Sequence, residues 1–263
     1  MVRRFTPHRK RTTIYVSCQA LNMVIRMEPS LRYPTKRSTF FTNQGERPIG
    51  AGIVLWRGYF QSVRPAIGRL LINVDTATGT MYRSGRLMDL VLEFLGQSTP
   101  NALTPQRGAQ RGLPERERLR LQHFLSGIKV TTPYRARDPD RRRFVKKVTR
   151  ESARERTFEI GEGEVMTVAE YFQNQLNMPL QYPDAICVEV RTTSVLSVGI
   201  SSRHDPQFST GAVVPLEFCQ VPPGQLARKN MSQDQTNSIL QFATMDPRTR
   251  RQSVQHGLGV CPV

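Results

Sequence analysis

The sequence predicts a mixed α+β fold, because short apolar runs typical of strands occur together with longer segments whose apolar residues recur at helical spacing. The strand-like runs are short and apolar, and they lie at Arg69–Asp75, Ala185–Arg191 and Val213–Cys219. The helix-like segments have an apolar stripe or face, and they lie at Gly85–Leu95, Glu115–Leu125 and Thr167–Leu176. With 263 residues, the chain can form one large domain or two small ones.

The first two helical segments are defined by their apolar faces. Within Gly85–Leu95, one stripe holds Leu87, Leu90, Val91 and Phe94. Gly96 suits the position just after the end of this helix, where a left-handed backbone is common. Within Glu115–Leu125, the expected apolar face is less regular and consists of Leu119, Leu121, Phe124 and Leu125.

The segment Thr167–Leu176 has the clearest start signal in the chain. Thr167 and Glu170 form a T-x-x-E capping box, in which each side chain satisfies a free N–H of the first helical turn. The residues expected to face the core are Val168, Phe172 and Leu176. Pro179 is expected to end this helix.

Further expectations rest on strand and turn propensity. Thr13–Gln19 is expected to form a strand, and Ala20–Met27 either a helix or a strand. Arg69–Asp75 is expected to be a buried strand, followed by a turn over Thr76–Thr80. The basic residues 1–13 are expected to be mobile.

Charge is the strongest signal in the composition. The chain has 38 Lys and Arg against 21 Asp and Glu, a formal net charge of +17. Its most basic segment is Tyr134–Arg156. A field of this sign attracts polyanions such as RNA, DNA and acidic membranes. A ribosomal or nucleolar protein has a similar composition, so charge alone does not choose among these classes.

The sequence disfavours enzymes, metal proteins and membrane-spanning proteins. It contains no Gly-rich phosphate loop, its acids are scattered and its histidines are isolated, so we expect a non-enzyme without a cofactor. The four cysteines form no CxxC pair, so we expect no metal site and reduced, mostly buried thiols. No run of 18 apolar residues occurs, so we expect no membrane partner and a cytoplasmic or nuclear location.

Several strings in the chain resemble eukaryotic Argonaute proteins, the fungal ones in particular. The string PIGAGIVLWRGYFQSVRPAIG, at Pro48–Gly68, is similar to the first linker domain of that family. Ala20–Thr42 resembles the end of the N domain. The strings TVAEYFQNQLNMPLQYPDAICVEV and VVPLEFCQVPPGQ resemble the second half of a PAZ domain, and Arg228–Ala243 resembles the start of the second linker.

The resemblance implies four segments: a partial N domain (1–47), linker 1 (48–96), a PAZ domain (97–222) and the start of linker 2 (223–263). MID and PIWI domains have no counterpart, and neither does the PIWI acidic tetrad that holds two metal ions. A PAZ domain implies an OB-like β-barrel with an αβ insertion, and a cleft between them for RNA 3′-terminal nucleotides. The implied partners are small single-stranded RNA or a duplex 3′ overhang, together with other silencing proteins.

The resemblance also assigns site residues. Tyr171 matches the helix tyrosine that donates to the terminal phosphate, and Phe158 matches an aromatic residue that packs against the terminal nucleotide. An R-x-Y element that meets phosphates is matched by Arg142 and Phe144 or, without a gap, by Arg141 and Arg143. Lys146 belongs to the same basic run, and the nearest counterparts of an upstream phosphate-binding residue are Tyr134 and Arg135. Tyr182, Trp56 and Arg64 are expected to be structural.

A departure from the family pattern keeps other functions open. The family often has Lys-Tyr where this chain has Gln175 and Leu176, which removes donors to phosphate. One alternative is therefore a truncated or degenerate Argonaute fragment that acts only as an interaction or decoy protein. The other is a polyanion binder that does not distinguish RNA ends.

Overall fold

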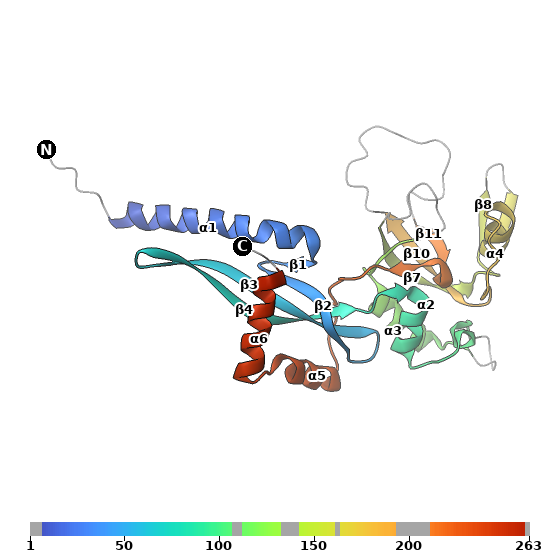
Figure 1. Cartoon of the computed structure of the whole chain (residues 1–263). Helices are drawn as coiled ribbons and strands as arrows, with labels where there is room; N and C mark the ends of the chain where they lie inside the picture. Colours follow the sequence, from blue (N-terminus) through green and yellow to red (C-terminus); the bar gives the residue numbers. More distant parts are fainter. Residues whose placement is uncertain (1–6, 107–111, 133–141, 161–163, 193–210, 261–263) are drawn as a thin grey trace. The chain divides into compact units, whose positions relative to one another are not determined.

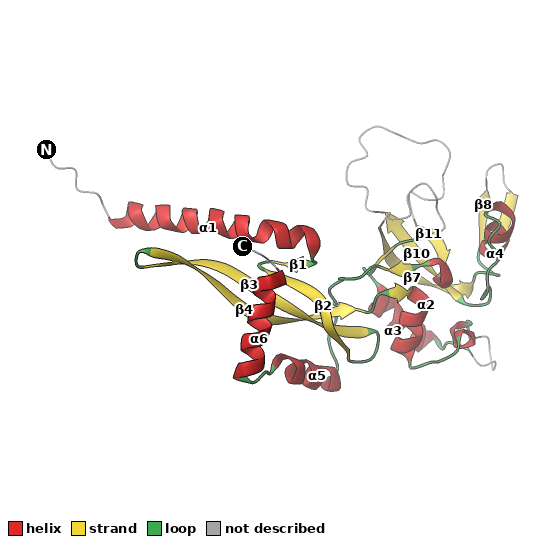
Figure 2. Ribbon diagram, viewed as in Figure 1, coloured by secondary structure: helices red, strands yellow, loops and turns green. Residues whose placement is uncertain are grey.

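The structure is a computed structural model that describes residues 7–106, 112–132, 142–160, 164–192 and 211–260. The chain folds into two compact units, each built from segments that are discontinuous in sequence (Figures 1 and 2). The first unit comprises Met1–Ile49, Val54–Met81 and Leu226–Val263, and the second comprises Gly50–Ile53 and Tyr82–Gln225. The division into four domains stays a prediction.

The first unit is built on a four-stranded sheet. Its strands, in spatial order, are β1 (Thr35–Lys36), β2 (Thr39–Pro48), β3 (Ile53–Ala66) and β4 (Arg69–Tyr82). A small apolar core joins these strands to the C-terminal part of the chain through Phe41, Val54, Trp56, Met81 and Leu226. The Trp56 indole also donates to Glu46 at 3.1 Å, which supports the expected structural role of this tryptophan.

Strand β4 corrects two expectations. The turn expected over Thr76–Thr80 is wrong, because the strand continues without a break to Tyr82. Gly79 is needed there for close packing, since a Cβ on it would lie 2.5 Å from Cε1 of the Phe41 ring. The expected burial of Arg69–Asp75 is also wrong, because Leu70 is 57% exposed. An apolar run identifies a strand, but burial depends on what packs against it.

Helix α1 (Pro7–Arg32) replaces the strand expected over Thr13–Gln19, which is therefore wrong. Of the two alternatives for Ala20–Met27, the helix is correct. The helix is held on β3 by polar contacts: the Val63 N–H donates to Asn22 Oδ1 at 2.8 Å, and Arg26 Nη2 donates to the Gln61 carbonyl at 3.1 Å. Tertiary contacts of this kind override the strand propensity of β-branched residues.

Two C-terminal helices complete the first unit. Helix α5 (Gln233–Ala243) begins with a capping box of Ser232 and Gln235, and α6 (Pro247–Val260) follows it. The Arg57 guanidinium lies 4.1 Å from the centroid of the Phe242 ring, and its Nη2 donates to the Phe242 carbonyl. Arg250 pairs with Asp75 of β4 at 2.8 Å and lowers the pKa of that carboxyl group.

The second unit contains a curled antiparallel sheet that fits an OB-like fold, so the predicted α+β class is confirmed. The strands, in spatial order, are β11 (Ala212–Pro215), β10 (Ile186–Thr192), β7 (Arg143–Ser152) and β6 (Lys129–Val130). Two register shifts interrupt the β10–β7 pairing, and irregularities of this type bend a sheet. Outside this sheet, β5 (Gly85–Arg86) pairs with β12 (Gln220–Val221), and β8 (Thr157–Ile160) with β9 (Glu164–Thr167).

Two helices of the second unit agree with the sequence. Helix α2 (Leu87–Leu95) begins two residues later than predicted, because Gly85–Arg86 forms β5, and it ends at Gly96, which has φ +65° and ψ +30° as expected. Helix α3 (Glu115–Leu125) has the predicted bounds. The rings of Phe94 and Phe124 stack 4.0 Å apart and join the two helices. Leu119 is an exception to the expected apolar face of α3, because it is 48% exposed while Arg118 is buried.

The segment after Thr167 is only partly a regular helix. The capping box is confirmed, since the Thr167 N–H donates to Glu170 Oε2 at 2.8 Å and the Glu170 N–H donates to Thr167 Oγ1 at 3.2 Å. After one α-helical turn, α4 (Val168–Glu170), a π-helical turn follows over Tyr171–Gln175. The helical segment ends at Gln175, one residue before the predicted end at Leu176 and four residues before Pro179. Val168 and Phe172 are buried as expected, but Leu176 is only half-buried.

The strand expected over Val213–Cys219 is shorter in the structure. Of the segment Val213–Cys219, only the part up to Pro215 belongs to β11, and a 3-10 turn (Leu216–Phe218) follows. Cys187 and Cys219 are free, buried thiols, as expected, and burial raises the pKa of Cys219 to about 12. Cys18 is free and half-buried, and Cys261 lies outside the described residues. None of the helices in the described ranges has the length and apolar character needed to cross a bilayer.

Two neighbouring glycines give a matched test of packing in the second unit. Gly50 (φ +81°) has open space around it, whereas a Cβ on Gly52 (φ +74°) would lie 2.5 Å from Leu90 Cδ1 of α2. We expect Gly50→Ala to cost about 1 kcal/mol, because an alanine is strained in this backbone conformation. Gly52→Ala should cost about 1–3 kcal/mol more, because a packed side chain must move. Urea unfolding measures both, and equal losses of stability would contradict the contact with Leu90.

Candidate nucleic-acid interface

An insertion after β7 positions two of the predicted site residues. It consists of the β8–β9 hairpin, α4 and the π-helical turn, and two backbone hydrogen bonds join it to the chain segment after β7. The Val168 N–H donates to the Arg156 carbonyl at 2.9 Å, and the Ala169 N–H donates to the Ala153 carbonyl at 3.0 Å. The start of the helical segment is therefore fixed relative to the end of β7.

The insertion brings Phe158 and Tyr171 together. Their ring centroids lie 5.4 Å apart in an edge-to-face arrangement with an interplanar angle of 75°. Both side chains are half-buried, whereas the next residue, Phe172, is 2% exposed and stacks on Phe218 at 5.0 Å. Phe172 thus anchors the turn and leaves Tyr171 on its flank. No residue in the described part of the chain forms a hydrogen bond with the Tyr171 hydroxyl.

Arg142, which directly precedes β7, and the first residues of this strand carry further predicted contacts. Arg142 is exposed and Phe144 is half-buried, whereas Arg143 is only 3% exposed, because alternate residues of a strand face opposite sides. The Lys129 ammonium lies 5.8 Å from the centroid of the Phe144 ring. Lys146 forms an ion pair of 2.7 Å with Glu189 of β10.

The structure does not bring all the predicted residues together. Tyr134, Arg135 and Arg141 lie outside the described residues. Within the part that is described, no hydrogen bond or ring contact joins the Phe158–Tyr171 pair to Arg142 or Phe144. No group of three His, Cys, Asp or Glu side chains in the described ranges could hold a metal ion.

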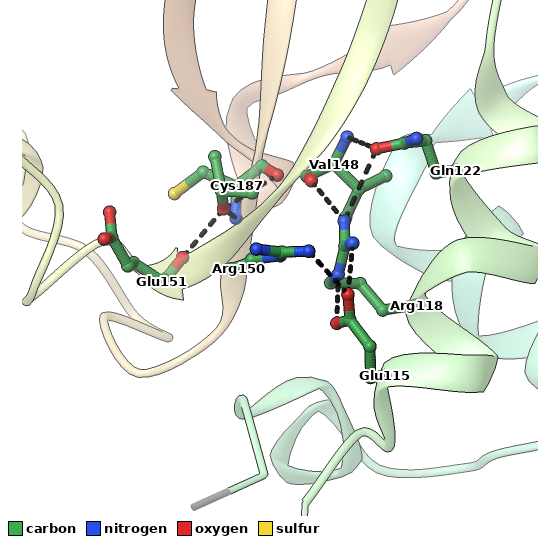
Figure 3. Close-up of polar contacts among 8 residues, drawn as sticks. Glu115, Arg118, Gln122, Val148, Arg150, Glu151 and Cys187 are labelled. Atoms are coloured by element: carbon green, nitrogen blue, oxygen red, sulfur yellow. Dashed lines mark hydrogen bonds and ion pairs between the residues drawn. The ribbon is translucent and has the colours of Figure 1, made fainter.

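An open groove, which could not be predicted from the sequence, lies between α3 and β7, and we call it the α3–β7 groove. It has a volume of about 430 Å³. Its lining comes from α3 (Arg118, Leu119, Gln122), from β7 (Lys147, Val148, Thr149, Arg150, Glu151), and from Arg156 and Glu189. Figure 3 shows the polar contacts between α3 and β7. The excess of basic residues in Tyr134–Arg156 was the available signal, but α3 enters this groove only through the fold.

A buried arginine holds α3 against β7 at this groove (Figure 3). The Arg118 side chain is 7% exposed and donates through Nη1 to the Val148 carbonyl at 2.8 Å. Its Nε and Nη2 donate to the two carboxylate oxygens of Glu115 at 2.7 and 2.8 Å. These hydrogen bonds lower the pKa of Glu115 to about 2 and raise that of Arg118. Two elements about thirty residues apart are therefore joined by one guanidinium group.

Other cations of the groove are more accessible. The Arg150 side chain is 78% exposed, and its Nη2 lies 3.2 Å from Glu115 Oε1. Both carboxylate oxygens of Glu115 already accept hydrogen bonds from Arg118. Lys147 is exposed and has no ion-pair partner among the described residues. Arg156 pairs with Glu151 at 3.0 Å. The groove therefore presents positive charge that its own carboxylates only partly neutralise.

Comparison with known proteins matches two segments of the chain to known domain families. Residues 35–83 match the Argonaute linker 1 domain, and residues 101–240, more than half of the chain, match the PAZ domain. The Kluyveromyces polysporus Argonaute, solved with a guide RNA, is 19% identical with a TM-score of 0.55 over 85% of this chain and 24% of that chain. The Drosophila Ago PAZ domain, solved with a 3′-end 2′-O-methylated RNA, is 25% identical with a TM-score of 0.37 over 53% of this chain and 98% of that one. The chain thus spans about a quarter of the length of the Kluyveromyces polysporus protein.

The contribution of Arg118 can be measured against a surface arginine on the same helix. Arg118→Ala removes the donor to the buried Val148 carbonyl, so we expect a loss of about 1–3 kcal/mol in the free energy of unfolding. Arg120 forms an exposed pair with Glu117 and lies 6.0 Å from the centroid of the Phe94 ring, so Arg120→Ala should cost no more than about 1 kcal/mol. Urea unfolding of the two variants gives the comparison. Similar losses in both would mean that Arg118 does not hold α3 on β7.

Proposed function

Because this chain belongs to the PAZ domain family and carries an Argonaute linker 1 domain, we propose that it is an RNA-binding part of an Argonaute-like protein. In this proposal it holds the 3′ end of a small guide RNA or of a duplex 3′ overhang. The observation that carries the proposal is the Phe158–Tyr171 pair, in which an aromatic face adjoins a hydroxyl that no described residue engages. The net charge of +17 supports an anionic ligand.

The pair offers the two interactions that an RNA end requires. A terminal nucleotide exposes an unstacked base and a phosphate, which proteins bind with aromatic faces and hydrogen-bond donors. The Phe158 ring packs against the terminal nucleotide, and the Tyr171 hydroxyl donates to the terminal phosphate. Phe172, buried against Phe218, holds the tyrosine in place. The pair therefore recognises an end through shape and one hydrogen bond.

Residues of β7 supply charge in this proposal. Arg142 binds a phosphate, and Phe144 stacks on a base. Arg142 is exposed and Phe144 is half-buried, whereas Arg143 lies on the buried side of the strand. This difference supports the pair Arg142 and Phe144 over the alternative pair Arg141 and Arg143. Lys146 can contribute by exchanging its partner Glu189 for a phosphate. Tyr134, Arg135 and Arg141 remain candidates through the family pattern alone. Gln175, an exposed neutral amide, stands where the family often has a cation.

The finer attributes of the protein belong to the same proposal. The two matched domains are binding and structural modules, and we propose that the chain itself is not an enzyme. We also propose a fungal-type Argonaute, a cytoplasmic or nuclear location and association with other silencing proteins. Because the chain spans only part of the solved Argonaute, the activity of a whole Argonaute is not assigned to it.

A binding titration with matched RNAs tests the proposal. The full chain is titrated with a short single-stranded RNA that has a free 3′ hydroxyl, and with the same RNA carrying a 3′ phosphate. We expect the free end to bind more tightly. Equal affinities, combined with a steep salt dependence, would support the alternative of a polyanion binder that does not distinguish RNA ends.

Tyr171→Phe isolates the hydrogen bond. It keeps the ring, so folding is expected to be unchanged, but the donor to phosphate is lost. A hydrogen bond to a charged group contributes about 1.5–3 kcal/mol, so the affinity for free 3′ ends should fall roughly 10- to 150-fold. Tyr182→Phe is the matched control and should leave the affinity unchanged. Fluorescence anisotropy measures both, and equal behaviour of the two variants would exclude Tyr171 as the donor.

Phe158→Leu isolates the stacking interaction. Leucine keeps an apolar side chain beside Tyr171 but removes the aromatic face. Stacking on a base contributes about 1–3 kcal/mol, so we expect the affinity to fall roughly 5- to 150-fold for every terminal base. The same titration measures the loss, with thermal unfolding as a control for stability. An unchanged affinity would mean that Phe158 only packs against Tyr171.

A further inference from the structure

We propose that the α3–β7 groove binds internal phosphodiester groups of the same RNA strand, upstream of its 3′-terminal nucleotide. This inference rests on the proposed function and extends it to a second surface. It predicts that the affinity of the chain depends on RNA length as well as on the RNA end.

The groove lies close in the chain to the Phe158–Tyr171 pair. Arg156 lines the groove, and its carbonyl accepts the hydrogen bond from the Val168 N–H that starts the helical segment of Tyr171. Phe158 follows Arg156 by two residues, so their Cα atoms lie within about 7 Å of one another. A strand whose last nucleotide packs on Phe158 therefore has its preceding phosphates within reach of the groove.

The accessible cations of the groove suit a phosphate backbone. Lys147 is exposed without an ion-pair partner among the described residues, and Arg150 shares a carboxylate that Arg118 already holds with two hydrogen bonds. Arg150 can leave Glu115 for a phosphate without leaving that carboxylate unpaired. Phosphates are strong acceptors for such side chains.

The remaining walls of the groove are compatible with RNA. Its carboxylates, Glu151 and Glu189, are each paired with a cation, Arg156 and Lys146. Between the cations, Thr149 fixes the strand, since its hydroxyl donates to the Glu151 carbonyl at 2.7 Å and accepts from the Cys187 N–H at 2.8 Å. The positive side chains therefore project from a rigid strand.

An acidic peptide is the competing ligand for a basic groove. The observations favour RNA, because eight of the ten lining residues are polar or charged and the two apolar ones are Leu119, which is 48% exposed, and Val148. Peptide recognition usually depends on buried anchors at the centre of the interface. A nucleic-acid backbone needs only accessible charge.

The test compares two RNA lengths on two charge-matched variants of the full chain. The groove variant is Lys147→Ala with Arg150→Ala, and the control is Arg86→Ala with Arg116→Ala, which removes two exposed cations of the same unit outside the groove. Each variant is titrated at several salt concentrations with single-stranded RNAs of about 4 and about 10 nucleotides that have free 3′ ends. The shorter RNA is chosen to reach only the Phe158–Tyr171 pair, and the longer one to reach the groove as well. Urea unfolding confirms that both variants fold.

We expect the groove variant to lose roughly 10-fold or more in affinity for the longer RNA, and less than about 3-fold for the shorter one. Its salt slope on the longer RNA should fall by about 1.4, because single-strand binding contributes about 0.7 for each neutralised phosphate. The control variant should change both affinities by less than about 3-fold.

Three results would overturn the inference. Equal losses of affinity in the groove and control variants would mean that binding depends on the overall positive charge and not on the groove. Equal losses of affinity for both RNA lengths would mean that Lys147 and Arg150 act at the 3′ end. Displacement of the longer RNA by poly-glutamate from the wild type but not from the groove variant would identify a surface for acidic proteins. Failure of the proposed function is distinguishable, because it abolishes the discrimination between a 3′ hydroxyl and a 3′ phosphate while the length dependence persists.

Discussion

The second unit depends on the buried guanidinium group of Arg118. This one side chain binds the main chain of β7 through Val148 and the start of α3 through Glu115. Strand β7 runs through the middle of the sheet and leads directly into the insertion that carries Phe158 and Tyr171. The position of α3, the shape of the α3–β7 groove and the start of the insertion are therefore linked through this guanidinium group, which acts together with the Val148–Gln122 hydrogen bond and the Arg150–Glu115 ion pair. Removing one partner of such a contact costs more than the contact itself contributes, because the other partner stays buried.

The sequence predicted those parts of the fold that interactions between residues close together in the chain determine. The capping box at Thr167, the left-handed Gly96 and the bounds of α3 each depend on residues within a few positions, and each is present in the structure. The errors arise where distant contacts decide. The segment Thr13–Gln19 has strand propensity but continues a helix that β3 binds, and the π-helical turn after Glu170 has no signature in apolar spacing.

The candidate site likewise contains some features that could be predicted from the sequence and others that could not. The family resemblance singled out Tyr171 and Phe158, and the structure brings their rings into contact. Helical spacing alone placed Tyr171 only on the flank of an apolar stripe. The sequence left open whether Arg142 or Arg143 is accessible, because a shift of one residue on a strand exchanges the buried and exposed sides. The α3–β7 groove could not be inferred, since its walls come from segments joined only by folding.

The buried thiols of the second unit have a practical consequence for chemical labelling. Alkylating reagents attack the thiolate form, and burial strongly raises the pKa of both Cys187 and Cys219. Of the three described cysteines, only Cys18 on α1 is partly open to solvent. A maleimide dye will therefore react with Cys18 before Cys187 and Cys219, so the chain can be labelled while the chemistry around Tyr171 stays unmodified.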